Sequence, residues 1–157
     1  MRINQNTERF DVRNRSGIIL IEKNKLALIE RHRAGKHYFA FPGGGIDEGE
    51  SPQETAVRET EEELGIHVEI KQKVAEVFFN GNTQFYFLVE KLSGEFGTGT
   101  GEEYGKYNPI HGTYHPLWIQ LADVLTNNVV PRELAELVVR SVKEGWPAKP
   151  VIIIEKK

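Results

Sequence analysis

The hydrophobic pattern of the first part of the chain predicts short strands joined by tight turns. Apolar residues run from Gly17 to Ile21 and from Leu26 to Ile29, and the polar residues between them are typical of a turn, so this pair predicts a hairpin. A brief aromatic strand, Tyr38 to Phe41, stops at a proline. Three glycines, 43–45, come next, and because glycine lets the backbone approach a ligand closely, we expect a loop there.

One helix has both ends marked in the sequence. Ser51 is a typical N-cap, Pro52 suits the first helical position, and Glu54 stands three residues after the cap. Gly65 follows Leu64 and is a typical C-cap. The pattern therefore predicts a helix of about 13 residues, about 20 Å long, that begins at Pro52.

The rest of the chain predicts more strands and two further helices. Val68–Phe79 and Gln84–Leu92 flank Asn80-Gly81-Asn82, a strong hairpin signal. Residues 93–113 lack periodicity, and we expect a long loop on the substrate side there. The remaining apolar segments predict a strand at 117–119, a short helix at 121–125, a longer helix at 131–144 and an edge strand at 151–154. Because no linker divides the 157 residues, we expect one domain spanning 1–157.

Composition narrows the class of protein. Hydrophobic residues make up 39% and charged residues 27% of the chain, which is ordinary for a soluble globular protein. The absence of cysteine excludes thiol catalysis, thiolate zinc sites and disulfides. Neither a signal peptide nor a membrane-helix run of about 20 apolar residues is visible, so we expect a cytoplasmic protein. A pI of about 6.0 and the lack of a broad basic stripe argue against nucleic-acid binding.

The net charge of −3 is unevenly distributed. Residues 44–66 contain eight acids and one base, so this window carries −7 and the remainder of the chain +4. A solvated acidic helix is the plain explanation of such a run. A bound cation is the alternative, and the positions of the acids along the helix favour it.

Three carboxylates share one face of the predicted helix. At 100° per residue, Glu59, Glu62 and Glu63 lie within an arc of about 100°. Glu59 and Glu63 form a like-charge pair four residues apart, which costs an isolated helix a few tenths of a kcal/mol, roughly. A hard cation such as Mg²⁺ resolves this repulsion and also bridges to phosphate oxygens of a substrate. The opposite side of the helix carries Val57, Thr60 and Leu64, which we expect to pack against the sheet.

Arg58 lies between these two faces, and Glu50 stands just before the helix cap. We expect the two to form a structural ion pair across the turn. Phosphate binding by Arg58 is the rival role, but the adjacent acids would compete for its guanidinium.

The window from Gly44 to Ile66 resembles the Nudix box. Thr60 departs from the pattern, where a bulky aliphatic residue is usual, but it carries no charge. Similarity to the family extends over about residues 17 to 140, because a proline-glycine turn precedes the box and a tryptophan strand follows it. Seven positions that the box fixes by residue type are matched, namely Gly44, Glu50, Arg58, Glu59, Glu62, Glu63 and Gly65.

The resemblance implies a fold and a reaction. The fold is an α/β class α/β/α sandwich with a mixed β-sheet and a loop-helix-loop metal site. The reaction is hydrolysis of a phosphoanhydride in a nucleoside diphosphate derivative, with one to three Mg²⁺ or Mn²⁺ ions. Dimers are frequent among similar proteins, so a homodimer is an open alternative to a monomer.

Site residues are carried over from the family onto matching positions. Glu59 and Glu63 would be the main metal ligands, and Glu62 a further ligand or the group that deprotonates water. Gly43 or Gly44 could contribute a backbone carbonyl to the metal or the substrate. The family's general base often lies outside the box, so the candidates for the base also include Glu102 and Glu103 in the long loop.

Substrate contacts are expected outside the box. Arg31 is a candidate phosphate contact, because the family often has arginine at the end of that strand, although it could equally belong to a charged hairpin tip. His115 stands where a glutamate is common, and it is either a substrate contact or an ordinary surface residue. Tyr86 is among the aromatic residues that could stack on a nucleobase, although aromatic residues in strands are more often core.

Several functions remain open on this basis. The leading one is hydrolysis of a nucleoside triphosphate, an oxidised deoxynucleoside triphosphate, a dinucleotide or a nucleotide sugar. Because substrate choice lies in loops, the box does not decide among these small molecules. A hydrolase acting on capped RNA ends is an alternative, since such an end carries the same anhydride. A non-catalytic nucleotide sensor is another, but its usual mark is a lost carboxylate, and none is missing here.

Overall fold

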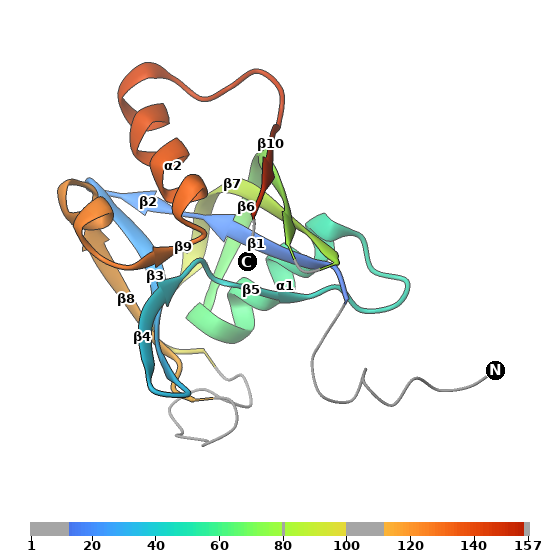
Figure 1. Cartoon of the computed structure of the whole chain (residues 1–157). Coiled ribbons are helices and arrows are strands. Elements are labelled where there is room, and N and C mark those ends of the chain that lie inside the picture. The colour runs from blue at the N-terminus through green and yellow to red at the C-terminus, as the bar shows by residue number, and fades with distance from the viewer. Residues whose placement is uncertain (1–12, 80, 100–111, 156–157) are drawn as a thin grey trace.

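The computed structural model describes residues 13–79, 81–99 and 112–155 (Figure 1). Glu102 and Glu103 lie outside these described residues. The elements, in chain order, are β1 (Arg15–Ile19), β2 (Ile21–Glu22), β3 (Lys25–Arg33), β4 (Lys36–Ala40), β5 (Gly43–Gly45), α1 (Pro52–Leu64), β6 (Ile66–Phe79), β7 (Asn82–Gly94), β8 (His115–Gln120), the 3₁₀-helix η2 (Leu121–Thr126), β9 (Val129–Val130), α2 (Arg132–Glu144) and β10 (Val151–Ile154).

The strands form two sheets. The first has the order β10-β6-β7-β1-β5 and is mixed, because β10 runs parallel to β6 and β1 parallel to β7, while β6–β7 and β1–β5 are antiparallel. The second has the order β2-β3-β4-β9, and β8 pairs with β3 on its other side. The expected mixed sheet is therefore present, with a second sheet beside it.

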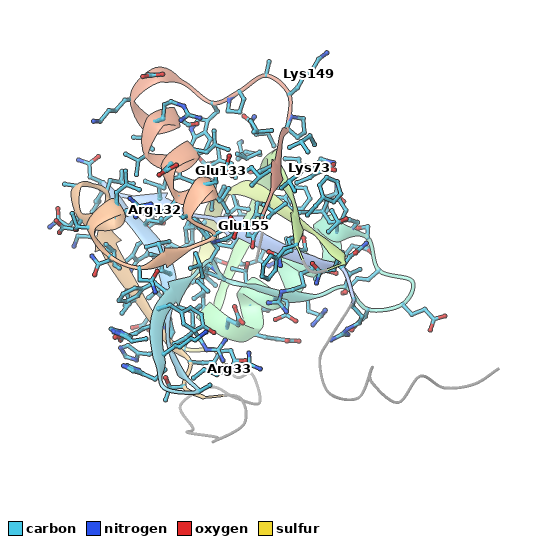
Figure 2. All side chains as sticks on the ribbon, in the orientation of Figure 1. Arg33, Lys73, Arg132, Glu133, Lys149 and Glu155 are labelled. Atoms are coloured by element: carbon cyan, nitrogen blue, oxygen red, sulfur yellow. The ribbon has the colours of Figure 1, made fainter. Side chains whose placement is uncertain are left out.

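Successive residues of the strands pack alternately into two separate hydrophobic cores. Ile18 and Phe87 pack with Ala56 and Leu64 of α1, whereas their neighbours Ile19 and Tyr86 belong to the cluster that contains the buried side chains of α2. This alternation follows from the period of two along a strand. Figure 1 accordingly shows α1 and α2 on opposite sides of β1 and β7, which confirms the α/β/α sandwich. Charged side chains such as Arg33 and Lys149 project from the outside (Figure 2).

Most of the expected elements are confirmed, but the strand expected from Gly17 to Ile21 is divided: β1 pairs with β7 and β5 in the first sheet, and only β2 pairs with β3. β2 and β3 form a hairpin in which Lys23 and Asn24 take positive φ of 52° and 64°. In the β6–β7 hairpin, Phe79 lies opposite Asn82. β10 occupies the edge of the first sheet, as expected for 151–154. None of the helices within the described residues is long and apolar enough to cross a membrane.

The prediction of a loop at the three glycines is wrong. Gly43–Gly45 is the short strand β5, which pairs antiparallel with β1 at the edge of the first sheet. Glycine is needed here for close packing, because a Cβ on Gly43 would meet the backbone of Gly17, 2.7 Å from its Cα. The strand pairing brings the glycine backbone against α1, where the acidic residues lie.

Candidate metal centre and active site

Local hydrogen bonds fix both ends of α1, and the buried Ala56 and Leu64 fix which face of the helix is turned to the core. The side chain of Ser51 accepts from the backbone N–H of Glu54 at 3.1 Å, and the Glu54 carboxylate accepts from the N–H of Ser51 at 2.9 Å. At the other end, Gly65 takes a φ of 78° and its N–H donates to the carbonyl of Glu61. This confirms the predicted capping box and C-cap. Thr60 and Leu64 are fully buried, and the Thr60 hydroxyl donates to Ala56 O at 2.7 Å, so the departure from the box leaves no unpaired polar group.

Two of the three acidic side chains on this face meet the glycine strand. Glu63 Oε1 accepts a hydrogen bond from the N–H of Gly43 at 2.9 Å. The Glu59 carboxylate lies against Gly44, where a Cβ would stand 2.6 Å from Oε1. Glu62 is more open, with 45% of its side chain exposed against 16% for Glu59. The three carboxylates therefore range from enclosed to solvent-facing.

Burial disfavours the charge on Glu59. Loss of solvent raises the pKa of the Glu59 carboxyl above its ordinary value, and the nearby negative charge of Glu62 acts in the same direction. The positive charge of Arg58 opposes both effects but does not overcome them. An enclosed carboxylate with a raised pKa favours any additional cation that binds beside it.

Arg58 holds together the polar side of the site. Its Nε and Nη2 donate to the two carboxylate oxygens of Glu50 at 2.8 and 3.0 Å, so the expected pair is present and bidentate. The same guanidinium reaches Glu59 at 3.0 Å, Glu62 at 3.4 Å and the carbonyl of Gly45 at 3.2 Å. The contacts to Glu59 and Glu62 agree with the expectation that the adjacent acids compete for this guanidinium.

Glu50 is the main anchor of Arg58. It also accepts from the Thr55 hydroxyl at 2.6 Å and from the N–H of Asp47 at 3.2 Å. The hydrogen bonds from Arg58 are the largest cause that lowers the pKa of Glu50 to about 2. Glu50 therefore stays ionised, and its position within this network is structural.

Among the described residues around Arg58, the carboxylates outnumber the arginines that pair with them. One guanidinium is shared among the carboxylates of Asp47, Glu50, Glu59 and Glu62, and Asp47 additionally pairs with Arg13 at 3.0 Å. Glu63 adds a further carboxylate beside Glu59. Carboxylate oxygens are the ligands that Mg²⁺ and Mn²⁺ prefer, so the donor set and its excess negative charge fit a divalent cation.

Two arginines near the site were missed by the sequence reasoning. Arg15 lies opposite Gly45 in the β1–β5 pair, and its positive charge lowers the pKa of Glu59. The Arg13 guanidinium lies against Gly45, where a Cβ would stand 2.6 Å from Nη2. No local signal could have found them, because the β1–β5 pairing joins segments about 30 residues apart.

Arg31 is buried on the face of β3 that packs into the same core as α1. It is only 8% exposed, its Nε donates to the carbonyl of Thr113 at 2.7 Å, and its guanidinium lies 3.7 Å from the centre of the Tyr114 ring. Its neighbour Ile29, on the same face of β3, belongs to the core cluster of α1. The phosphate contact expected for Arg31 stays a prediction.

The other two substrate candidates differ in their exposure. His115 is exposed at the start of β8, opposite Glu30 of β3. Tyr86 is 8% exposed and lies in the core on the α2 side, where its ring meets Phe41 edge-on and its hydroxyl donates to Gln84 Oε1 at 2.8 Å. Burial raises the pKa of Tyr86 to about 12. The structure thus gives Tyr86 the core position that was the alternative to base stacking.

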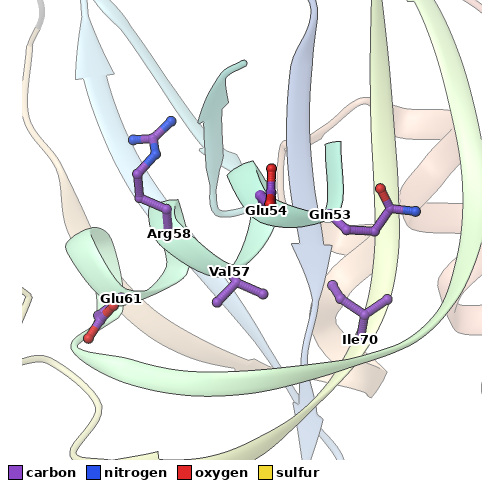
Figure 3. A pocket seen from close by; sticks show the side chains of 6 residues that line it. All are labelled: Gln53, Glu54, Val57, Arg58, Glu61 and Ile70. Atoms are coloured by element: carbon purple, nitrogen blue, oxygen red, sulfur yellow. The ribbon is translucent and has the colours of Figure 1, made fainter. Parts of the chain in front are cut away.

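A shallow hollow of about 400 Å³ lies on the outer side of α1. Figure 3 shows Val57 of α1 and Ile70 of β6 facing one another in it. Gln53, Glu54, Arg58 and Glu61 complete its lining, while Glu59 and Glu63 take no part. The candidate metal ligands Glu59 and Glu63 therefore lie outside this hollow, and Arg58 borders both.

Comparison with known proteins agrees with this geometry. The NUDIX domain family matches residues 12–138. The 8-oxo-dGTP diphosphatase of Escherichia coli (strain K12) is 38% identical over 87 residues, which is 50% of this chain and 66% of that protein. The RNA pyrophosphohydrolase of Pseudoalteromonas translucida (strain TAC 125) is 40% identical over 57 residues, 36% of this chain and 33% of that protein. The chain thus matches less than two thirds of the length of these relatives.

Solved structures share the fold. A NUDIX hydrolase from Nitrosomonas europaea superposes with a TM-score of 0.68 at 20% identity, covering 90% of this chain and 78% of the other. At this identity the likeness concerns the arrangement of helices and strands.

Proposed function

The chain belongs to the Nudix family, and from this membership we propose that it is a divalent-metal-dependent pyrophosphohydrolase that cleaves a phosphoanhydride in a nucleoside diphosphate or triphosphate derivative, with water as the nucleophile. The observation that carries the proposal is the convergence of Glu59 and Glu63 on the backbone of Gly43 and Gly44. A purely structural acidic helix gives no reason to enclose one carboxylate and to fix another with a backbone N–H.

Each acidic residue has a distinct task in the proposed reaction. Glu59 and Glu63 would hold Mg²⁺ or Mn²⁺, with a backbone carbonyl of Gly44 as a further candidate ligand. A bound ion would neutralise the negative charge of the phosphate oxygens and lower the pKa of a bound water molecule. Arg58, anchored on Glu50, keeps the Glu59 carboxylate in place through its 3.0 Å contact. It acts as a positioning residue.

Glu62 is our candidate for the group that accepts the proton of the attacking water. Its side chain is 45% exposed, so a water molecule can reach it, and it lies on the same helical face as Glu59 and Glu63. Glu102 and Glu103, outside the described residues, stay alternative bases. Replacement of each of the three in turn, followed by single-turnover rates as a function of pH, distinguishes them.

For the substrate we propose a small nucleotide. The similarity to an 8-oxo-dGTP diphosphatase favours a nucleoside triphosphate, including an oxidised one, over a dinucleotide or a nucleotide sugar. A second candidate is the 5′ end of an RNA, because several relatives are RNA pyrophosphohydrolases. The pI of about 6.0 and the lack of a broad basic stripe in the sequence argue against RNA as the substrate. The sensor alternative receives no support, because all the box carboxylates are present.

The decisive experiment is turnover with Mg²⁺ or Mn²⁺ on a panel of nucleotides, nucleotide sugars and 5′-triphosphate RNA, with phosphate and pyrophosphate release measured separately. We expect Glu63→Gln to lower the rate by about a hundredfold or more, because several kcal/mol of charge stabilisation are lost. Glu61→Gln, on the same helix but outside the acidic face, is the matched control and should keep the wild-type rate. Equal rates for Glu63→Gln and wild type would contradict the assignment of Glu63 as a metal ligand. Binding of nucleotides without turnover across the panel would favour a sensor.

The homodimer and the cytoplasmic location considered above stay predictions. The mass of the protein in solution, at the concentration of the assay, tests the first.

A further inference from the structure

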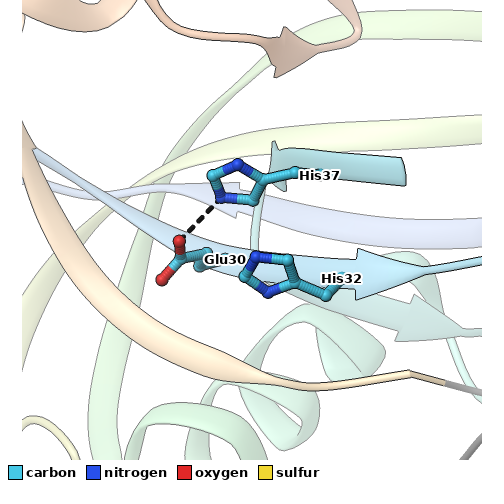
Figure 4. A group of neighbouring side chains, drawn as sticks. All are labelled: Glu30, His32 and His37. Carbon is cyan, nitrogen blue, oxygen red and sulfur yellow. Dashed lines mark hydrogen bonds and ion pairs between the residues drawn. The ribbon is translucent and has the colours of Figure 1, made fainter. Parts of the chain in front are cut away.

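The β3–β4 hairpin gathers a carboxylate and two imidazoles on one surface. Glu30 and His32 are two residues apart on β3, so their side chains leave the same face of the sheet. His37 of β4 is the register partner of His32 and shares that face. One ligand atom from each of the three side chains lies within 4.8 Å of the other two. Figure 4 shows the three groups converging.

The contacts within this cluster, which we call the hairpin cluster (Glu30, His32, His37), are specific. His37 Nε2 lies 2.7 Å from Glu30 Oε2. The His32 and His37 rings are stacked, with centroids 4.3 Å apart and planes within 1° of parallel. Thr113 Oγ1 accepts from the backbone N–H of His32 at 3.0 Å and lies 3.5 Å from its Nδ1. Thr113 thus holds the backbone of His32, and its hydroxyl lies beside one nitrogen of the imidazole.

An ordinary surface ion pair explains only part of this arrangement. Such a pair accounts for Glu30 and His37 and contributes about 0–1 kcal/mol. It gives no role to His32, whose ring is set face to face with His37 beside the same carboxylate. Two imidazoles and one carboxylate are, by contrast, a common ligand set for Zn²⁺ and related transition-metal ions.

The neighbouring strand offers a fourth ligand. His115 of β8 is the register partner of Glu30, so its side chain leaves the same face as the hairpin cluster. His32, His37 and His115 are all exposed, so their side chains have room to rotate. Because the lone pair of an imidazole nitrogen lies in the ring plane, the His32 and His37 rings leave their parallel stack when both bind one ion. Ligand atoms at the usual distances of about 2.0–2.2 Å from the ion then lie about 3.3 Å from one another.

The hairpin cluster is separate from the acidic face of α1. Glu30 and His32 share their face of β3 with Leu26 and Leu28, which belong to the core on the α2 side. The carboxylates belong to α1, whose buried Ala56 and Leu64 pack in the other core, together with Ala27 and Ile29 from the opposite face of β3. Their chemistry differs as well, since carboxylates suit Mg²⁺ and imidazoles suit Zn²⁺.

We propose that Glu30, His32 and His37, completed by His115, form a second metal site that is selective for Zn²⁺-like transition-metal ions. A bound ion there joins three neighbouring strands, β4, β3 and β8, at one end of the second sheet. It also fixes the backbone on either side of Arg31, which stands between Glu30 and His32 and points to the opposite face.

The test is a calorimetric titration of untagged protein with Zn²⁺ alone, in the presence of saturating Mg²⁺ to occupy the acidic face. The expected result is one Zn²⁺ site whose affinity falls by at least about tenfold in His32→Ala and in His37→Ala. His67→Ala is the matched control, because His67 is an exposed histidine of β6 in the first sheet, and it should bind Zn²⁺ like wild type. His115→Ala should weaken the affinity by a smaller factor.

A second measurement needs no variant. Substoichiometric Ni²⁺ should broaden the imidazole NMR signals of His32, His37 and His115 before that of His67. Wild-type Zn²⁺ affinity in both His32→Ala and His37→Ala would overturn the proposal, as would loss of Zn²⁺ binding in Glu63→Gln with the hairpin cluster intact. An unchanged affinity in His115→Ala would remove that residue from the ligand set.

Discussion

Gly44 and Glu59 are packed so closely that no side chain fits between them: a Cβ on Gly44 would overlap the Glu59 carboxyl, 2.6 Å from Oε1. The pair joins the edge strand β5 to the acidic face of α1. Glycine at this position is therefore required by the close approach of a carboxylate. Backbone conformation is not the reason, because Gly44 does not take a positive φ.

Gly44→Ala should displace the Glu59 carboxylate and lower kcat/KM by about tenfold or more, since overpacking costs about 1–3 kcal/mol. Gly49→Ala is the control. At Gly49 the φ of 83° strains an alanine, but no atom lies within 4 Å of its Cβ, so stability falls by about 1 kcal/mol while Glu59 is untouched. Steady-state kinetics at several Mg²⁺ concentrations, together with urea unfolding, separate the two effects. Equal kcat/KM in both variants would show that Glu59 is not displaced.

Glu59→Gln should leave the metal-free protein as stable as wild type at neutral pH, or more stable by about 1 kcal/mol. The pKa of Glu59 is raised by burial, so its charged form costs the folded state free energy that a neutral amide does not. Thermal unfolding in a chelator measures this, with Glu61→Gln, at an exposed position of α1, as the control. A clear loss of stability in Glu59→Gln would mean that the ion pair with Arg58 stabilises the folded protein by more than the burial of the Glu59 charge destabilises it.

The stability of the wild-type protein should contain an acid-dependent contribution from Glu50. Its pKa is lowered from 4.5 to about 2 in the folded state, so its contribution is present above pH 4.5 and is lost as the pH falls towards 2. Glu50→Gln should be less stable than wild type at neutral pH by about 1–3 kcal/mol, because its hydrogen bonds to Arg58 lose their charge. The difference should shrink below pH 4.5. Urea unfolding of both proteins across this range checks it, and parallel pH profiles would contradict it.

Arg31→Ala should raise KM for a nucleotide by about tenfold if Arg31 contacts a phosphate, which corresponds to about 1.4 kcal/mol. It should also lower stability by about 1–3 kcal/mol, because the bond to Thr113 and the stack on Tyr114 are lost. Arg33→Ala, at an exposed position on the same face of β3, is the control. If KM were unchanged in Arg31→Ala while stability fell, Arg31 would be a structural residue only.

The sequence by itself determined the helix that carries the acidic residues. Its N-cap, first-turn proline and C-cap act within a few residues of each other, so Ser51, Glu54 and Gly65 define α1 without reference to the rest of the chain. The same local character applies to the hairpins and to the arc shared by Glu59, Glu62 and Glu63. The family followed from these residues as well.

Tertiary structure alone decided what these residues touch. Gly43–Gly45 became a strand because β1 lies beside it, Tyr86 entered the core because its face of β7 is turned to α2, and Arg31 met Thr113 across 82 positions of sequence. The hairpin cluster likewise required the register of β3 with β4 and β8. Local hydrogen bonds and periodicity act over one or two turns, whereas burial and strand partners depend on segments that only the folded chain brings together.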